Sequence, residues 1–255
     1  MTNDPFFNNV LIGVFIAAAL FTIVLFITTA PYGKQERDGW GPGIPIRWGW
    51  FLLEFPSFAV FAWFYLNSDH RFSAVPLVLF ILWEIHYVHR TFIYPLRLRA
   101  KPGAQEKIII LLFGIIFNAS NGYLNGLYIG QYAEHLYSNS WFSDPRFILG
   151  ILLFAGGFAL TKHSDALLRN LRKPGETGYK IPVGGAFRWV SCPNYLGEII
   201  QWGGFALASW SLAGLAFMAF TAANLIPRAI SNHKWYLEKF EQYPKERKSV
   251  IPFIL

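Results

Sequence analysis

Seven long apolar runs, bounded by proline, glycine or charged residues, constrain this chain more than any other feature of its sequence. Each run is close to the roughly 20 residues that a helix needs to cross a hydrocarbon layer about 30 Å thick. With 54% hydrophobic and only 15% charged residues, the composition also argues against a water-soluble enzyme. We therefore predict an all-α, polytopic membrane protein with seven transmembrane helices. The helices are expected over residues 9–29, 47–66, 74–95, 107–130, 146–166, 190–208 and 211–229.

The first apolar run and the single cysteine narrow the possibilities further. Residues 9–29 have no basic segment before them and are too long for the apolar part of a signal peptide, so we expect a retained helix. Cys192 is the only cysteine, which excludes an intramolecular disulfide and a zinc site built on cysteines. The sequence contains no internal repeat, and a single membrane domain over residues 1–255 is predicted.

The distribution of basic residues predicts the orientation. With seven spans, every lysine and arginine except Arg71 and Arg146 falls on one side of the membrane. This is the positive-inside pattern, which places basic loops in the cytosol. We expect the N-terminus outside and the C-terminus in the cytosol. The net charge of +7 is then a cytosolic surface charge, explained in part by topology and anionic lipids, and no nucleic-acid partner is expected.

Two acidic residues interrupt the apolar runs. Glu54 lies within WFLLEFPSF, and Glu84 lies within the third run. A charged side chain at the centre of a span costs about 2.5 to 3.5 kcal/mol on insertion scales, so both carboxyl groups should face protein or water. Trp50 and Ser57 share a helical face with Glu54, which indicates a binding face, although an interhelical hydrogen bond would also explain either acid.

The segment HYVHRTFIYP ends the third predicted helix and places Tyr87 and Arg90 on one face. A buried tyrosine near an acid can donate a strong hydrogen bond to a substrate oxygen, whereas a tyrosine belt at the membrane interface is the alternative. His86 and His89 invite a metal hypothesis. Membrane di-iron enzymes need several histidine boxes, however, and this chain has one close pair, so no metal is predicted.

Polar stripes with helical spacing cluster towards the cytosolic side. Basic groups there could bind phosphates and Asp165 could bind ribose hydroxyls, so a nucleotide cofactor fits, although lipid head groups explain part of the same pattern. The sequence has neither GxGxxG after a strand nor GxxxxGK[ST], so helices and loops must hold any cofactor. The stripes comprise Lys162, Asp165, Arg169 and Arg172; Asn194, Glu198 and Gln201; and Asn224, Arg228, Asn232 and Tyr236. A further stripe, Asn118, Asn121 and Asn125, is interpreted as joining helices.

Five ordered segments resemble the steroid 5-alpha-reductase family. They are WFLLEFPSF, EIHYVHRTFIYPLR, HSDALLRNLRKPGETGYKIP, PNYLGEIIQWGGFALASWSL and YLEKFEQYPKERKSVIPFIL, and they extend from about residue 48 to the C-terminus. The resemblance implies a seven-helix membrane enzyme that uses NADPH to reduce the 4,5 double bond of 3-oxo-Δ4-steroids. It also implies a catalytic and cofactor-binding region over about residues 105–255.

The resemblance further implies roles for individual residues. Glu54 and Tyr87 would hold the 3-keto oxygen, and Trp50 and Phe117 are assigned to the steroid site. Cofactor contacts are implied for Asp165, Arg172, Tyr179, Asn194, Glu198, Arg228, His233 and Tyr236. The positions that depart from the family pattern, and so bear on steroid preference and phosphate binding, are Leu53, Leu98, Lys101 and Thr161.

The expected mechanism is polarisation of the 3-oxo group by Tyr87 and a neutral Glu54, hydride delivery to C5 and protonation at C4. The steroid would enter from the lipid and NADPH from the cytosol, in a bacterial inner membrane or the endoplasmic reticulum, with no obligatory protein partner. Three alternatives are kept. They are a related membrane reductase of enoyl-CoA or sterol double bonds, a methyltransferase of the isoprenylcysteine or phospholipid type, and a transporter that uses the intramembrane acids.

Overall fold

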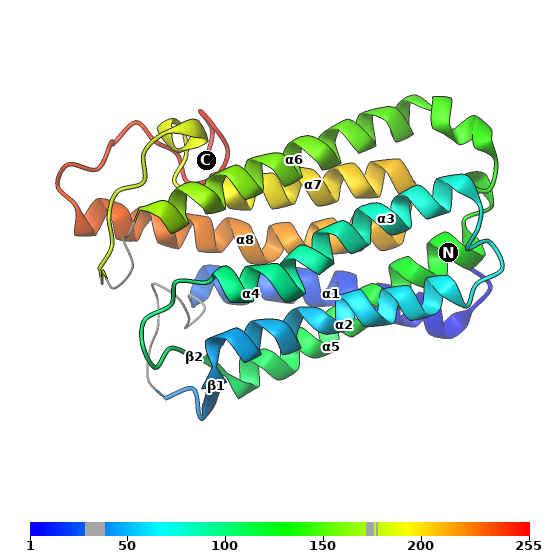
Figure 1. The fold of residues 1–255 in the computed structure, drawn as a ribbon, viewed down its shortest axis with the longest axis horizontal. Helices are drawn as coiled ribbons and strands as arrows, with labels where there is room; N and C mark the ends of the chain where they lie inside the picture. The colour runs from blue at the N-terminus through cyan, green and yellow to red at the C-terminus, as the bar shows by residue number, and fades with distance from the viewer. Residues whose placement is uncertain (29–38, 172–175, 177) are drawn as a thin grey trace.

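The computed structural model describes residues 1–28, 39–171, 176 and 178–255, and it is mostly helical (Figure 1). Within this part of the chain, five helical segments are long and apolar enough to cross a membrane, which confirms a helical protein with several membrane spans. They are α1 (Pro5–Ile27), α2 (Ile46–Leu66), α5 (Ile108–Leu127) continued to Tyr132, α6 (Pro145–Asn170) and α8 (Leu212–Lys239).

The other two expected spans are also helical but shorter. Helix α3 (Ala74–Val88) has 15 residues and continues through a π-helical turn, η2 (His89–Ile93), into α4 (Tyr94–Arg97). Helix α7 (Pro193–Ser209) has 17 residues. Short 3-10 or π turns complete the description at η3 (Tyr128–Tyr132), η4 (Glu134–Leu136), η5 (Asn139–Ser143) and η6 (Gly185–Arg188).

The sequence did not predict two features. The otherwise helical fold contains one small sheet, in which β1 (Gly43–Pro45) pairs antiparallel with β2 (Gln105–Lys107), directly before α2 and α5. Strands of three residues are too short to show an alternating pattern. Helix α8 also runs ten residues beyond the predicted end at residue 229, since its last turns are polar and lie outside the apolar run.

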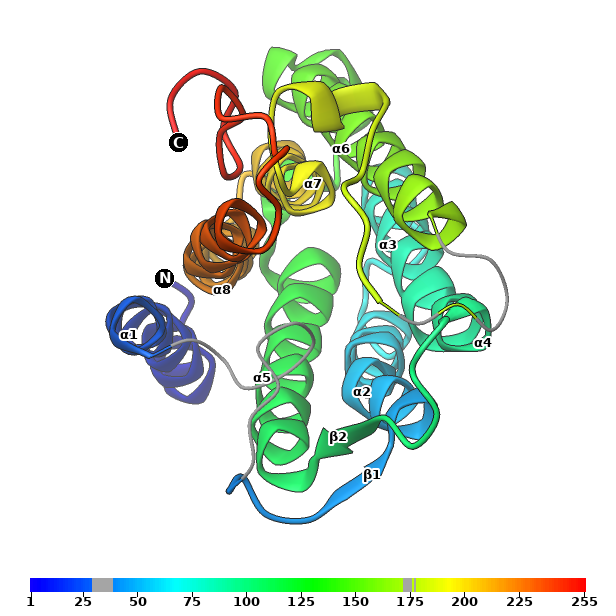
Figure 2. The same cartoon turned by 90° about the vertical axis from the view of Figure 1, so that its left-hand side faces the viewer.

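The helices pack mainly as two close pairs, α6 with α7 and α2 with α5 (Figures 1 and 2). Glycines allow the first pair to approach closely: a Cβ atom at Gly157 of α6 would lie 2.5 Å from the backbone nitrogen of Gln201 in α7. In the second pair, Asn118 Nδ2 donates to the carbonyl of Leu53 at 2.7 Å, and Asn118 Oδ1 accepts from Ser57 Oγ at 2.8 Å. This bears out the interpretation of Asn118 as a residue that joins helices.

Large aromatic rings fill the space between the helix pairs. Trp83 of α3 stacks on Phe61 of α2 at 4.4 Å between centroids and contacts Trp202 and Phe205 of α7 at 5.3 Å. Helix α1 lies on the outside of the bundle against α8 (Figure 2). Many of its large apolar side chains are exposed, as expected for a helix that faces lipid.

The antiparallel order of the helices collects the basic segments at one end of the molecule. This basic end holds β1, β2, the start of α7, the end of α8 and the C-terminus, on the left of Figure 1. The opposite end holds the N-terminus, the connection from α2 to α3, which contains Arg71, and the start of α6, which contains Arg146. The charge asymmetry seen in the sequence is therefore an asymmetry between the two ends of the bundle.

Candidate active site

Arg90 is the centre of a buried ion-pair network that joins three elements. Its Nε and Nη2 atoms lie 3.1 and 2.9 Å from Glu54 Oε1 of α2, and its Nη1 atom lies 3.0 Å from Glu198 Oε1 of α7. The rings of Trp50 and Tyr94 flank the guanidinium, with centroids 4.9 and 5.6 Å from Cζ. The side chains of Arg90, Glu54 and Glu198 are only 17, 7 and 13% exposed, so the network lies inside the bundle.

The π-helical turn η2 positions Arg90 and Tyr94. Pro95 has no N–H to continue the α-helical pattern, and Tyr94 N–H donates to the carbonyl of His89, five residues back. This wider turn inserts one residue, which rotates the residues that follow by about 100° relative to α3. Single π turns of this kind are frequent at functional sites.

Glu54, which we expected to act as a neutral acid, contacts Arg90 in the structure. Its Oε1 atom accepts a hydrogen bond from Arg90 Nε and lies 2.9 Å from Nη2, which is the geometry of an ion pair. An ionised carboxylate is only an acceptor. The expected donation to a ketone oxygen therefore requires that Glu54 carry a proton and turn it towards the ketone.

Tyr87 lies in the same part of the bundle and is almost completely buried, with 2% of its surface exposed. The rings of Trp83, His86 and Trp202 surround it at 5.0 to 5.9 Å between centroids. Contacts on both sides of Tyr87 join its helix to α2: Trp83 Nε1 donates to the carbonyl of Ser57 at 3.0 Å, and Arg90 binds Glu54. The structure thus places Glu54 and Tyr87 on facing parts of α2 and α3, in an apolar and aromatic environment.

The two residues assigned to the steroid site occupy different surroundings. Trp50 lies in the network, over Arg90 and edge-on to Tyr94 at 4.9 Å. Phe117 of α5 stacks on Phe220 of α8 at 3.7 Å between centroids, on the side of α5 that faces α8. Trp50 is therefore joined to Glu54 through Arg90, whereas Phe117 belongs to the contact between α5 and α8.

Three of the predicted cofactor residues come together near Arg90. Asn194 Nδ2 donates to Asp165 Oδ1 at 3.2 Å, and Glu198, one turn along α7, binds Arg90. Thr161, one of the positions that depart from the family pattern, donates through Oγ1 to the carbonyl of Asn194 at 3.2 Å. A carboxylate and an amide side by side are suited to hydroxyl groups such as those of a ribose.

Four further predicted cofactor residues lie nearer the basic end. Arg228 is over the ring of Tyr195 at 5.4 Å, and Tyr179 packs edge-on against Trp235 at 4.8 Å. His233 Nδ1 is 2.6 Å from Ser191 Oγ, which also lies 2.6 Å from Tyr243 Oη. Tyr236 stacks on Tyr243 at 5.0 Å. The remaining prediction, Arg172, falls outside the described residues.

Both histidines of the third helix bind protein side chains. His86 Nδ1 is 2.8 Å from Gln201 Nε2, and His89 Nδ1 is 2.9 Å from Lys162 Nζ. In the described part of the chain, no group of three potential ligands is placed to hold a metal. The sequence showed Arg90 on the face of Tyr87 but not its two carboxylate partners, because they come from helices far away in the chain.

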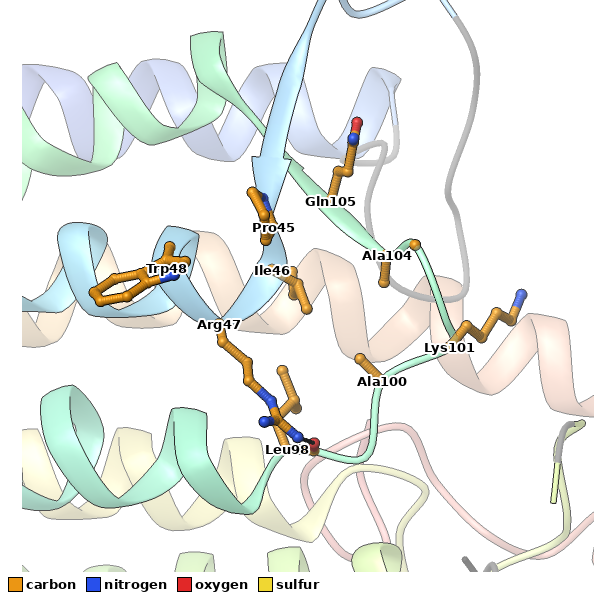
Figure 3. A pocket seen from close by; sticks show the side chains of 10 residues that line it. Pro45, Ile46, Arg47, Trp48, Leu98, Ala100, Lys101, Ala104 and Gln105 are labelled. Atoms are coloured by element: carbon orange, nitrogen blue, oxygen red, sulfur yellow. Dashed lines mark hydrogen bonds between the residues drawn. The ribbon is translucent and has the colours of Figure 1, made fainter. Parts of the chain in front are cut away.

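A surface pocket of about 390 Å³ opens at the basic end, between the start of α2 and the loop that follows α4 (Figure 3). Arg47 extends towards Leu98, whose carbonyl accepts a hydrogen bond from Nη2 at 3.5 Å, and Lys101 stands on the loop itself. Leu98 and Lys101 are two of the positions that depart from the family pattern. The pocket is thus basic and distinct from the Arg90 network, which involves none of its lining residues.

Comparison with known proteins decides the family. Residues 104–255 match the sequence model of a family described as 3-oxo-5-alpha-steroid 4-dehydrogenase. The chain is 44% identical over 228 residues to 3-oxo-5-alpha-steroid 4-dehydrogenase 1 of Rattus norvegicus, which covers 89% of this chain and 86% of the relative. It is 40% identical over 259 residues to steroid 5-alpha-reductase DET2 of Arabidopsis thaliana, and this alignment covers 100% of this chain and 98% of the relative. The chain belongs to the 3-oxo-5-alpha-steroid 4-dehydrogenase family.

Membership of this family confirms the resemblance found in the sequence and makes the protein an oxidoreductase. A type 2 relative, from Macaca fascicularis, is 44% identical over 251 residues and covers 97% of each chain. The likeness therefore extends to mammalian relatives of both types and to plants, and includes the first helices, which the family model does not cover. The methyltransferase and transporter alternatives are set aside by this result.

Proposed function

We propose that this protein uses NADPH to reduce the 4,5 double bond of 3-oxo-Δ4-steroids to 5α-3-oxosteroids. The names of its relatives support the steroid class. The observation that carries the proposal is the placement of a buried acid, Glu54, and a buried tyrosine, Tyr87, on facing parts of α2 and α3 inside an apolar bundle. A hydrogen bond to a ketone oxygen is strong in such a low-dielectric site.

The residues present fit a nucleotide cofactor at the basic end. Asp165 and Asn194 offer the polar pair suited to ribose, and Arg228 and Lys162 offer cations suited to phosphates. NADPH, when bound, supplies the hydride equivalent. Glu54 and Glu198 lie about 12 and 8 Å along their helices from the basic end, at a rise of 1.5 Å per residue. A nucleotide could therefore reach them from that side.

The chain's own residues are assigned the following parts of the reaction. The Tyr87 hydroxyl donates to the 3-keto oxygen and draws electron density from the enone, so that C5 becomes electrophilic. Glu54 supplies a second hydrogen bond after it has taken up a proton. C5 receives the hydride, C4 receives a proton, and the rings around Tyr87 exclude water from the ketone.

The orientation is part of the proposal. The basic end faces the cytosol, the N-terminus lies outside, and all seven helices span the membrane, α3 together with η2 and α4. The positive-inside pattern and the position of the basic loops at one end of the bundle support this arrangement. A steroid then enters from the lipid and the anionic cofactor from the cytosol.

The test is NADPH oxidation by the protein in nanodiscs with progesterone or testosterone, with the product identified by mass and stereochemistry. We expect a gain of two hydrogens and the 5α configuration. NADPH binding without turnover of any 3-oxo-Δ4-steroid would shift the substrate to enoyl-CoA or sterol double bonds. Absence of NADPH binding would overturn the proposal.

A further inference from the structure

The two carboxylates that Arg90 binds have been assigned to different ligands. Glu54 belongs to the proposed steroid site and Glu198 to the proposed NADPH site, and they lie on α2 and α7. Arg90 uses Nε and Nη2 for the first and Nη1 for the second. One planar guanidinium thus connects the two sites directly.

The burial of the network makes this connection energetically significant. Attraction between charges is weakly screened at sites that exclude water, and removing one partner of a buried ion pair leaves an uncompensated charge. The rings of Trp50 and Tyr94 lie against the guanidinium and restrict its movement away from the two carboxylates. A ligand group that engages either carboxylate must therefore change how Arg90 interacts with the other.

We propose that Arg90 is a positioning residue that couples steroid binding to nucleotide binding, an inference that rests on the proposed function. In the ligand-free protein Arg90 holds both carboxylates. The first ligand to engage Glu54 or Glu198 must open this bridge, and the second then binds a network that is already open. Each ligand consequently tightens the binding of the other, by the same factor in both directions.

The experiment uses NADP⁺ and testosterone, a pair that binds without reacting, so that equilibrium constants can be measured. The dissociation constant of NADP⁺ is determined by titration calorimetry with and without saturating testosterone, for protein in nanodiscs. We expect testosterone to lower it about fivefold or more, within the range usual for coupled sites.

Two variants remove the bridge in different ways. Arg90→Lys keeps the charge, but an ammonium group lacks the planar fork that binds both carboxylates together. Glu198→Gln keeps a side-chain oxygen but removes one charge, and provides a second test if Arg90→Lys fails to fold. In both variants we expect testosterone to change NADP⁺ affinity less than twofold. Arg97→Lys, the same substitution on the exposed end of α4, is the matched control and should retain full coupling.

The outcomes separate this inference from the proposed function. If wild-type protein fails to turn over 3-oxo-Δ4-steroids with NADPH, the proposed function fails. If wild-type protein does turn them over but testosterone leaves NADP⁺ affinity unchanged, or if Arg90→Lys retains the full coupling, the role of Arg90 is overturned. If Arg90 had a merely structural role, Arg90→Lys would reduce the affinities for both ligands or the folded fraction. The ratio of the NADP⁺ dissociation constants with and without testosterone would then stay as in wild type.

Discussion

At the scale of single residues, the charged groups inside the bundle divide into paired and unpaired ones. Glu54, Arg90 and Glu198 satisfy one another. Both carboxyl oxygens of Glu84 are buried, and the described residues offer them no hydrogen-bond partner. The sequence predicted that both intramembrane acids would face inward. It could not distinguish an acid with a partner from one without, because Arg90, the partner of Glu54, is 36 residues away.

The Tyr87 hydroxyl gives the most direct test of the chemistry. Tyr87→Phe removes one donor to the ketone and leaves the ring packed among Trp83, His86 and Trp202. Loss of one such donor typically lowers turnover about 100- to 1000-fold. We expect that loss in kcat with the NADPH dissociation constant unchanged within about twofold. Near-normal kcat in this variant would show that Tyr87 does not polarise the ketone.

Glu84 should limit stability rather than activity. Replacing a buried, unsatisfied polar group with an apolar one recovers about 1 to 3 kcal/mol. Glu84→Leu is therefore expected to raise the thermal unfolding temperature in detergent and to retain activity. Glu54→Leu is the matched change at a paired acid. It should lower the thermal unfolding temperature, because Arg90 loses a partner. Loss of activity in Glu84→Leu would instead assign Glu84 a functional role.

At the scale of elements, apolar run length predicted the positions of the helices but not the features that set the site. The π turn η2 directly precedes Tyr94 and Pro95, and hydropathy carries no signal for it. The strands β1 and β2 directly precede α2 and α5, which lie side by side, so their pairing joins segments about 60 residues apart in the chain. Local pattern therefore located the helices, and contacts between distant segments determined the rest.

The α6–α7 pair depends on glycine at the contact. A Cβ atom at Gly157 would lie 2.5 Å from the backbone carbonyl of Gly197 as well as from the nitrogen of Gln201, so Gly157→Ala must push α6 from α7. We expect a loss of about 1 to 3 kcal/mol, typical of overpacking. Because Asn194 and Glu198 lie on α7, weaker NADPH binding should follow.

Gly156→Ala is the control, since a Cβ atom there meets nothing within 4 Å. It should stabilise the protein by about 0.5 to 1 kcal/mol, because alanine favours a helix interior. Thermal unfolding of Gly157→Ala and Gly156→Ala, measured in the same detergent, checks both predictions. Equal changes in stability for Gly157→Ala and Gly156→Ala would show that the packing of α6 on α7 does not require a glycine at position 157.

The strand β2 carries a group whose ionisation should affect stability. Burial raises the pKa of the Glu106 carboxyl, although Arg228 acts in the opposite direction. The folded protein therefore holds this proton more tightly than the unfolded chain, and stability is lost as pH rises above about 4.5 through the folded pKa. Relative to wild type, Glu106→Gln should become progressively more stable over that interval.

Unfolding temperatures of wild type and Glu106→Gln measured across this pH range check the prediction. Glu241→Gln, at an exposed position, serves as the control and should show no such trend. A difference that decreases as pH rises would mean that the Glu106 carboxylate is stabilised in the fold, with the attraction to Arg228 exceeding the effect of burial.

At the scale of the whole molecule, the separation of charge between the two ends accounts for how a membrane enzyme can serve two unlike ligands. Apolar side chains are exposed along α1, α5 and α6, where the bundle meets lipid. The basic end offers cations to an anionic ligand, and Glu54 and Glu198 are within about 12 Å of it. This polarity was readable from the sequence, because it depends on the order of spans and loops rather than on side-chain contacts.

The orientation can be measured directly because Cys192, the only cysteine, is buried. We expect Asn139→Cys, exposed at the end opposite the basic end, to react with a membrane-impermeant maleimide in intact cells or sealed vesicles of cytosolic-side-in orientation. Glu241→Cys, exposed at the basic end, should react only after permeabilisation. Wild type reports the background from Cys192. Reversed labelling would place the basic end outside, against the positive-inside pattern, and NADPH could then not reach Glu198 from the cytosol.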